Sequence, residues 1–197
     1  MISIQARLDQ IKDKISDPSF RESKGLGNEI GYYIFDYDPQ EEMKVREYIG
    51  YLKQRINTSN STIYIREFDL YEIVLEILDN KGYLQKNFDM EQKRGSDFVL
   101  NATKKALRLT LNGDLVVEYI SQSVQKNDVV FLTGIGKVYP IIRSHTILNN
   151  LHSAVDSVPV IMFFPGSYDG QELVLFNEIK DDNYYRAFQL IDKYKGF

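Results

Sequence analysis

The stretch that decides the fold is DVVFLTGIGKVYPIIRSHTILNNLHSAVDSVPVIMFFPGSYDGQELVLF, which spans Asp128 to Phe176. It contains two continuous apolar runs, Val129–Leu132 and Val160–Phe164, as expected for strands that are covered on both faces. Thr133–Gly136 ends the first run with two glycines, where the backbone must turn tightly. A helix between the runs would bring the chain back to the sheet. The stretch therefore predicts a strand–helix–strand unit with parallel strands.

Further strands are predicted on either side of this unit. Tyr32–Phe35 is a short apolar run, residues Thr62–Phe68 alternate between apolar and polar side chains, and Leu173–Phe176 follows turn dipeptides. Segments with apolar residues at three- and four-residue intervals separate most of these strands and indicate helices. The sequence thus predicts one α/β domain over residues 1–197, with a mainly parallel sheet of about five strands and helices on both faces.

Three segments carry more specific expectations. Residues 84–95 are polar and charged, which favours an exposed loop. A helix is expected through Ile141, Ile142 and Leu148, and a capped helix is expected over Asp181–Phe188.

Composition restricts the chemistry open to the chain. There is no cysteine, which excludes disulfides and thiolate zinc sites, and the two histidines, His145 and His152, are too far apart for a paired metal site. We therefore assign no metal site and no cofactor, although an oxygen-ligand magnesium site stays open. No apolar run is long enough for a membrane span, and the first residues lack the pattern of a signal peptide, so a cytoplasmic location is expected.

Asp36-Tyr37-Asp38 follows an apolar strand and raises the possibility of an enzyme. Haloacid-dehalogenase-like phosphotransferases carry such an Asp-x-Asp pair, followed later by a strand-end Thr or Ser, a lysine and an acidic pair. Thr133, Lys137 and Asp181-Asp182 occur in that order here. Pro39, however, occupies a position where that family has a small residue. The alternative is that Asp36 and Asp38 cap the helix that follows, and both interpretations stay open.

Polar residues also follow the third and fourth predicted strands, where α/β proteins bind ligands. Arg143-Ser144-His145 could bind an anion or a carboxylate of a partner protein, or Ser144 could simply cap a helix. Tyrosines are frequent in this sequence and are favoured at protein interfaces. The predicted partner-binding surface consists of Tyr139, Arg143, His145, Tyr168, Asp169, Tyr184 and Arg186.

A basic cluster of Lys104, Lys105 and Arg108 is the only sign of direct nucleic-acid binding. The whole chain carries 28 acidic and 24 basic residues, a net charge of −4, which disfavours a general nucleic-acid-binding role. Contact with nucleic acid is therefore expected only through other proteins.

Several long blocks resemble the BrxB family of BREX phage-defence systems. They are YIFDYDP (33–39), REFDLYEIVLEIL (66–78), FLTGIGKVYPIIRSHTILNNLH (131–152), PVIMFFPGSYDGQELVLF (159–176) and DDNYYRAF (181–188). The blocks occur in the family's order, and the resemblance covers nearly the whole chain.

This resemblance implies a small accessory subunit without an established enzyme activity. It also implies association with the alkaline-phosphatase-like PglZ subunit, and possibly with other BREX components, while methyltransferase, ATPase and PglZ subunits carry the chemistry. The family offers no catalytic residues to transfer to this sequence.

Overall fold

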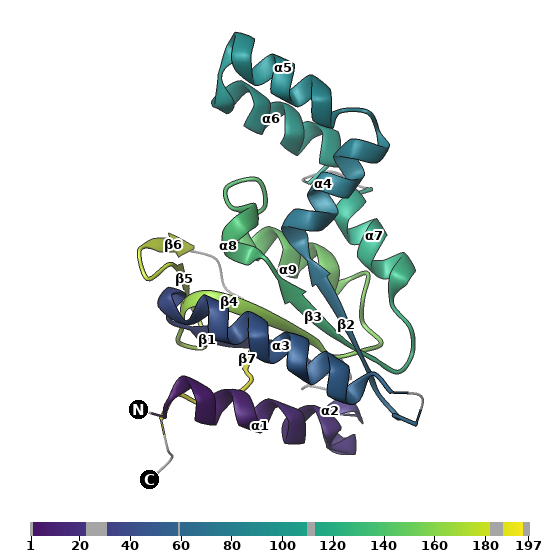
Figure 1. Cartoon of the computed structure of the whole chain (residues 1–197), viewed down its shortest axis with the longest axis vertical. Coiled ribbons are helices and arrows are strands. Elements are labelled where there is room, and N and C mark those ends of the chain that lie inside the picture. The colour runs from purple at the N-terminus through teal and green to yellow at the C-terminus, as the bar shows by residue number, and fades with distance from the viewer. Residues whose placement is uncertain (1, 23–30, 59, 110–112, 182–186, 195–197) are drawn as a thin grey trace.

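Seven strands form one sheet in the computed structural model, which describes residues 2–22, 31–58, 60–109, 113–181 and 187–194. The strands are β1 (Tyr32–Tyr37), β2 (Tyr64–Asp69), β3 (Asp128–Thr133), β4 (Val160–Tyr168), β5 (Leu173–Leu175), β6 (Ile179–Asp181) and β7 (Phe188–Gln189). Five of them lie in the order β2-β3-β4-β1-β7 and are parallel (Figure 1). β5 and β6 form an antiparallel extension of the end of β4. The predicted mainly parallel sheet is confirmed.

Helices cover both faces of this sheet (Figure 1). They are α1 (Ile4–Ser16), α2 (Pro18–Glu22), the short 3-10 helix η1 (Pro39–Glu41), α3 (Glu42–Ile56), α4 (Leu70–Asn80), α5 (Leu84–Arg94), α6 (Ser96–Leu107), α7 (Leu115–Ser123), α8 (Ile135–Val138) and α9 (Ser144–His152). α1 and α3 pack on one face, while α4, α7, α8 and α9 pack on the other.

Alternate side chains of the central strands enter different cores, because successive residues of a strand point to opposite faces. In β3, Val129 and Phe131 join the core under α1 and α3, whereas Val130 and Leu132 join the core under α4 and α9. Every residue of β3 is buried. Burial on both faces explains the unbroken apolar run in the sequence.

β2 is an edge strand, and the side chain of Asn57 covers part of its free edge. The Asn57 amide nitrogen donates to the Ile65 carbonyl oxygen at 2.9 Å, and its amide oxygen accepts the Ile65 N–H at 2.7 Å. Asn57 therefore imitates one residue of a neighbouring strand. An open strand edge attracts other chains, so this side chain protects the sheet.

The three specific expectations were wrong in whole or in part. Residues 84–95 are not a loop, because Leu84–Arg94 form helix α5. None of the residues of α5 is buried, so its composition is as polar as that of a loop. Ile141 and Ile142 are not helical, because the chain breaks between α8 and α9 around Pro140. At the C-terminus, Phe188 lies in strand β7, and most of the expected helix falls in residues 182–186, outside the described part of the chain.

Among the helices of the described residues, none is both long enough and apolar enough to cross a bilayer.

Candidate partner-binding site

Loops at the carboxyl edge of the parallel sheet contain Tyr139, Arg143 and Asp169 of the predicted surface, and His145 lies in the first turn of α9. β2 and β3 run in register from Tyr64 and Asp128 to Asp69 and Thr133, so both strands end at the same edge. The β3–α8 turn, the α8–α9 turn and the β4–β5 turn lie at this edge (Figure 1).

Asp69 and Lys137 join the ends of β2 and β3. The Asp69 carboxylate caps α4 by accepting the N–H groups of Tyr71 at 3.1 Å and Glu72 at 3.3 Å. Its other oxygen pairs with Lys137 Nζ at 2.5 Å. Gly134, which separates β3 from α8, has a φ of +74° and lies directly against this carboxylate. The predicted glycine turn is therefore also a site of close packing.

Thr133, a residue of the possible phosphotransferase, is mostly buried and bonded internally. Its hydroxyl donates to Glu67 Oε1 at 3.0 Å, and Glu67 Oε2 pairs with Lys53 Nζ at 2.7 Å. The hydroxyl thus links β3 to the neighbouring edge strand.

Asp36 is the most densely bonded carboxylate of the predicted residues, and its side chain is 0 % exposed. Arg7 approaches Oδ1 at 3.0 Å, Lys193 pairs with Oδ2, and the Tyr168 N–H donates to Oδ2 at 2.9 Å. A second Arg7 nitrogen donates to the Asp36 backbone oxygen at 2.6 Å. Burial lowers the pKa of Arg7, and the adjacent Asp36 carboxylate partly offsets this. Asp36 therefore holds α1 and the C-terminal segment against the sheet.

The two aspartates of the Asp-x-Asp pair have different roles in the fold. Asp38 caps η1 by accepting the Gln40 N–H at 3.0 Å, as the capping interpretation predicted. Asp36 is not a cap. β4 lies between β1 and β3, so Asp36 and Thr133 are on strands that are not neighbours.

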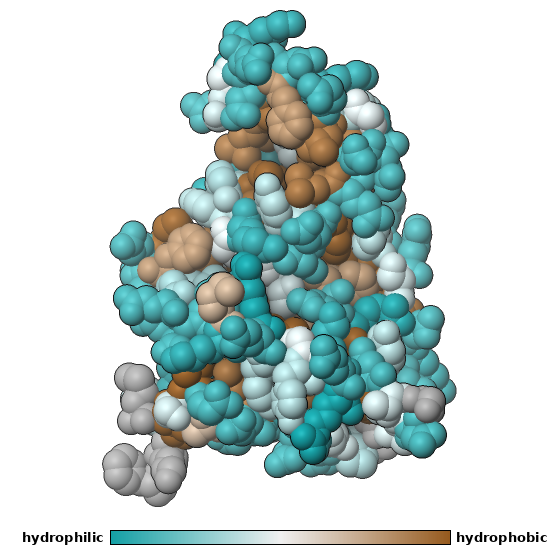
Figure 2. Space-filling view, in the orientation of Figure 1, coloured by the Kyte–Doolittle hydropathy of each residue, from teal (hydrophilic) through white to brown (hydrophobic). Residues whose placement is uncertain are grey.

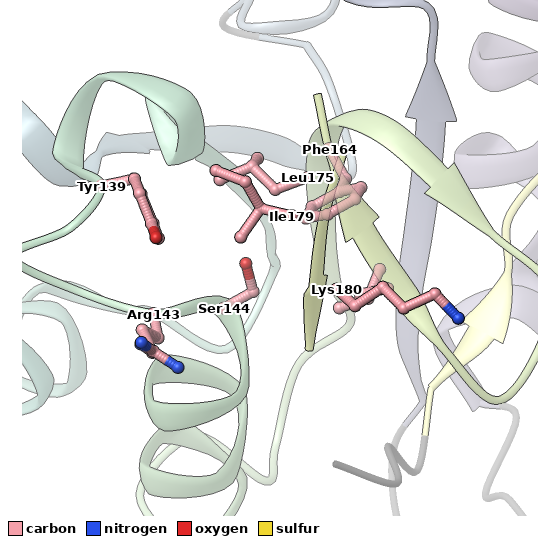
Figure 3. A pocket seen from close by; sticks show the side chains of 8 residues that line it. Tyr139, Arg143, Ser144, Phe164, Leu175, Ile179 and Lys180 are labelled. Carbon is pink, nitrogen blue, oxygen red and sulfur yellow. The ribbon is translucent and has the colours of Figure 1, made fainter. Parts of the chain in front are cut away.

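A shallow pocket separates the α8–α9 turn from the β5–β6 hairpin (Figure 3). Tyr139 and Ser144 face it from one side, while Leu175 and Ile179 face it from the other. Its cavity volume is about 20 Å³, which is enough for one water molecule and far too little for a nucleotide. Lys180 points away from the pocket, toward Glu172 at 3.3 Å.

The exposed part of the predicted surface lies around this pocket. Arg143 is exposed immediately before α9, and Tyr139 and His145 are half-buried. Asp169 is exposed on the β4–β5 turn and accepts the N–H groups of Glu172 at 2.7 Å and Gln171 at 2.9 Å, which lowers the pKa of its carboxyl group. Ser144 does not cap α9, because it is the first helical residue and is buried.

The remaining predicted residues are divided between the interior and segments not described. The side chain of Tyr168 is only 4 % exposed, and its hydroxyl donates to the Ala187 carbonyl at 2.7 Å, so it offers almost no surface to a partner. Tyr184 and Arg186 lie outside the described residues. The basic cluster lies at the C-terminal end of α6 and consists of Lys104, Lys105 and Arg108.

Within the described ranges, no group of three or more His, Asp or Glu side chains is arranged to hold a metal ion. The described residues at the carboxyl edge supply an arginine and a tyrosine beside a shallow pocket, and a carboxylate on the β4–β5 turn. Such an arrangement can bind a complementary protein surface through charge-assisted hydrogen bonds and aromatic contacts.

Comparison with known proteins gives the family. The model of the family "BREX protein BrxB" matches residues 66–190, which include most of β2, all of β3 and β4, and the carboxyl-edge loops. The chain belongs to the BrxB family. A BrxB protein of Bacillus cereus (strain H3081.97) is 73 % identical over 193 residues, covering 98 % of this chain and 100 % of the relative. A BrxB protein of Escherichia coli O9:H4 (strain HS) is 32 % identical over 190 residues, covering 95 % of this chain and 92 % of the relative. No solved structure gives a significant match.

Membership of the BrxB family places the chain in the BREX phage-defence systems and confirms the resemblance seen in the sequence blocks. The anchoring partners of Asp36 in this BrxB protein, Arg7 and Lys193, were missed by sequence reasoning. Arg7 occupies a position on the apolar stripe of α1, since it is buried together with Leu8 and Ile11. A charged residue on the buried side of a predicted helix was the available signal.

Proposed function

We propose that this BrxB-family protein is a non-catalytic assembly subunit of a BREX system, and that it binds the PglZ-like subunit in the cytoplasm. Family membership supports the BREX role. The PglZ-like partner follows from the resemblance between the sequence blocks and the family.

The bonding of Asp36 is the observation that carries the non-catalytic proposal. Both carboxylate oxygens accept contacts from protein groups, and the side chain is fully buried. A nucleophilic carboxylate must reach its substrate, so Asp36 in this arrangement is suited to holding elements together. Thr133 is likewise bonded to Glu67.

The partner surface proposed for the PglZ-like subunit is the exposed part of the carboxyl edge, centred on Arg143. Its guanidinium can pair with a carboxylate of the partner in a bidentate manner, which gives the orientation of the contact. Tyr139 lies in the α8–α9 turn, His145 in the first turn of α9 and Asp169 in the β4–β5 turn.

Size-exclusion chromatography of the purified protein mixed with its PglZ-like subunit tests this proposal. A stoichiometric peak that elutes before either component is expected. Arg143→Glu should weaken the complex at least tenfold in a titration, whereas Lys12→Glu, the same charge reversal on the exposed side of α1, should leave it unchanged. Separate elution of the wild-type proteins would refute the partner, and equal binding by the two variants would refute the surface.

A further inference from the structure

The helices α5 and α6 form a hairpin that extends from one end of the molecule (Figure 1). Its base is part of the core, because Leu107 is 0 % and Leu109 is 5 % exposed. Its outer part packs mainly on itself: none of the residues of α5 is buried, and Asn87 donates to the Thr103 hydroxyl at 3.1 Å between the two helices. From these helices Leu84, Ala106 and Leu107 contact the core, and the rest of the hairpin extends beyond it.

Apolar side chains of this hairpin face solvent. Phe88 is 52 % exposed and Tyr83 is 38 % exposed. Phe98, Val99 and Leu100 on α6 are only half-buried and belong to neither core cluster. Figure 2 shows hydrophobic side chains gathered over the hairpin and α4 within a hydrophilic surround. A contiguous exposed apolar patch on a protein surface is typical of an interaction site.

The charge of the hairpin is opposite to that of the rest of the chain. Residues 81–108 contain seven basic and three acidic residues, although the whole chain has 24 basic and 28 acidic ones. Some of these cations lie beside the apolar patch. The Arg94 guanidinium is 3.7 Å from the centre of the Phe98 ring, and Lys86 Nζ is 5.5 Å from the centre of the Tyr83 ring.

The combination of an apolar centre and surrounding basic residues indicates which kind of partner the hairpin can bind. Two copies of this hairpin would bring their positive charges together, which disfavours a contact between identical hairpins. Nucleic acid would satisfy the basic residues but would leave Phe88 without an apolar environment. A protein groove with an apolar floor and an acidic rim satisfies both features, as in other complexes where helices bind in grooves.

We infer that the α5–α6 hairpin is a second docking element, distinct from the carboxyl-edge loops, for an acidic, apolar-lined groove on a partner protein. This inference rests on the proposed role as an assembly subunit, because it takes the PglZ-like subunit as the protein that bears the groove. Phe88 would fill the groove, while Lys86 and Lys93 would approach its rim. Buried aromatic residues usually dominate the affinity of such contacts, and the charges mainly govern the rate and salt dependence of association.

Calorimetric titration of the PglZ-like subunit with three single variants tests the inference. Phe88→Asp should weaken binding at least tenfold. Tyr51→Asp on α3 is the matched control, because Tyr51 is an aromatic helix residue with 51 % exposure, and it should bind as the wild type does. Lys93→Glu should weaken binding several-fold and reduce its dependence on salt.

The outcomes separate this inference from the proposed function. If the wild type does not bind the PglZ-like subunit, the proposed partner fails, and this docking role fails with it. If the wild type binds and Phe88→Asp binds equally well, the hairpin inference alone is overturned. A salt-sensitive gel shift with duplex DNA that is lost in Lys93→Glu but kept in Phe88→Asp would overturn it in favour of nucleic acid.

Discussion

The carboxylate of Asp69 occupies the space that a side chain on Gly134 would need. A β-carbon built on Gly134 would lie 2.3 Å from Asp69 Oδ1, and the φ of +74° is itself a conformation that favours glycine. Asp69 cannot withdraw without loss, because it caps α4 and pairs with Lys137. This contact packs the turn after β3 against the end of β2, where the candidate site begins.

Gly134→Ala is expected to lower the free energy of unfolding by about 2–3 kcal/mol. About 1–2 kcal/mol comes from the left-handed backbone and about 1 kcal/mol from the disturbed cap. Urea denaturation measures the loss. Gly82→Ala is the control, since Gly82 has a φ of +65° but nothing within 4 Å of the added carbon, and it should lose only the backbone contribution. Equal losses in the two variants would show that the Asp69 contact contributes nothing to the free energy of unfolding.

Asp36→Asn is expected to lower the free energy of unfolding by about 3–5 kcal/mol, because it leaves Arg7 and Lys193 without their shared counter-charge. Asp38→Asn should change stability by less than about 0.5 kcal/mol, since asparagine caps helices as well as aspartate does. Thermal and urea unfolding of both variants check this. A loss of phage defence in Asp36→Asn is evidence for catalysis only if the variant keeps wild-type stability. Wild-type stability of this variant would contradict the prediction made here.

Alkaline pH is expected to destabilise the protein through two buried tyrosines. Burial raises the pKa of Tyr32 and Tyr37 well above the ordinary value of 10.0, and the hydrogen bond from Tyr37 to Glu42 adds to this effect. Each phenol then stays protonated in the folded protein at pH values where the unfolded chain has lost the proton. The free energy of unfolding is therefore not reduced by these two groups below pH 10. Above pH 10 it falls by about 1.4 kcal/mol per pH unit for each tyrosine.

Tyr37→Phe should therefore show a shallower loss of stability between pH 10 and higher pH than the wild type, by the contribution of one tyrosine. Urea denaturation at several alkaline pH values measures the slope. Tyr119 is half-buried, and its hydrogen bond to Glu76 also raises its pKa, but less than burial raises that of Tyr37. Tyr119→Phe should therefore reduce the alkaline loss over a narrower pH range than Tyr37→Phe does. Parallel curves for the wild type and Tyr37→Phe would contradict the assignment.

Asn57→Ala is expected to expose the edge of β2. Removing the amide leaves the N–H and carbonyl groups of Ile65 without their partner, which should cost about 1–2 kcal/mol of stability. Light scattering should detect concentration-dependent self-association, because the freed edge can pair with another chain. Asn149→Ala, on the exposed side of α9, should remain as stable and as little associated as the wild type.

Local sequence patterns predicted the sheet better than they predicted its surroundings. The continuous run at Val129–Leu132 and the alternation at Thr62–Phe68 both correspond to strands. A strand buried on two faces has a continuous apolar run, and a strand buried on one face has alternating apolar and polar residues. Helix α5 was predicted as a loop, because none of its residues is buried and polar and charged residues dominate its sequence. The helix expected at Phe188 was wrong because pairing with β1, which is remote in sequence, determines that segment.

The α/β class, the parallel core strands and the BrxB family resemblance can be read from residue order, because apolar runs, turn residues and long matching blocks are local features. Only the tertiary structure decided the strand order and the different roles of Asp36 and Asp38. It also decided that Tyr168 is buried while Phe88 is exposed. The physical reason is that these outcomes depend on partners distant in the chain: Arg7 and Lys193 meet at Asp36 only after the two ends of the sequence pack against the same strand.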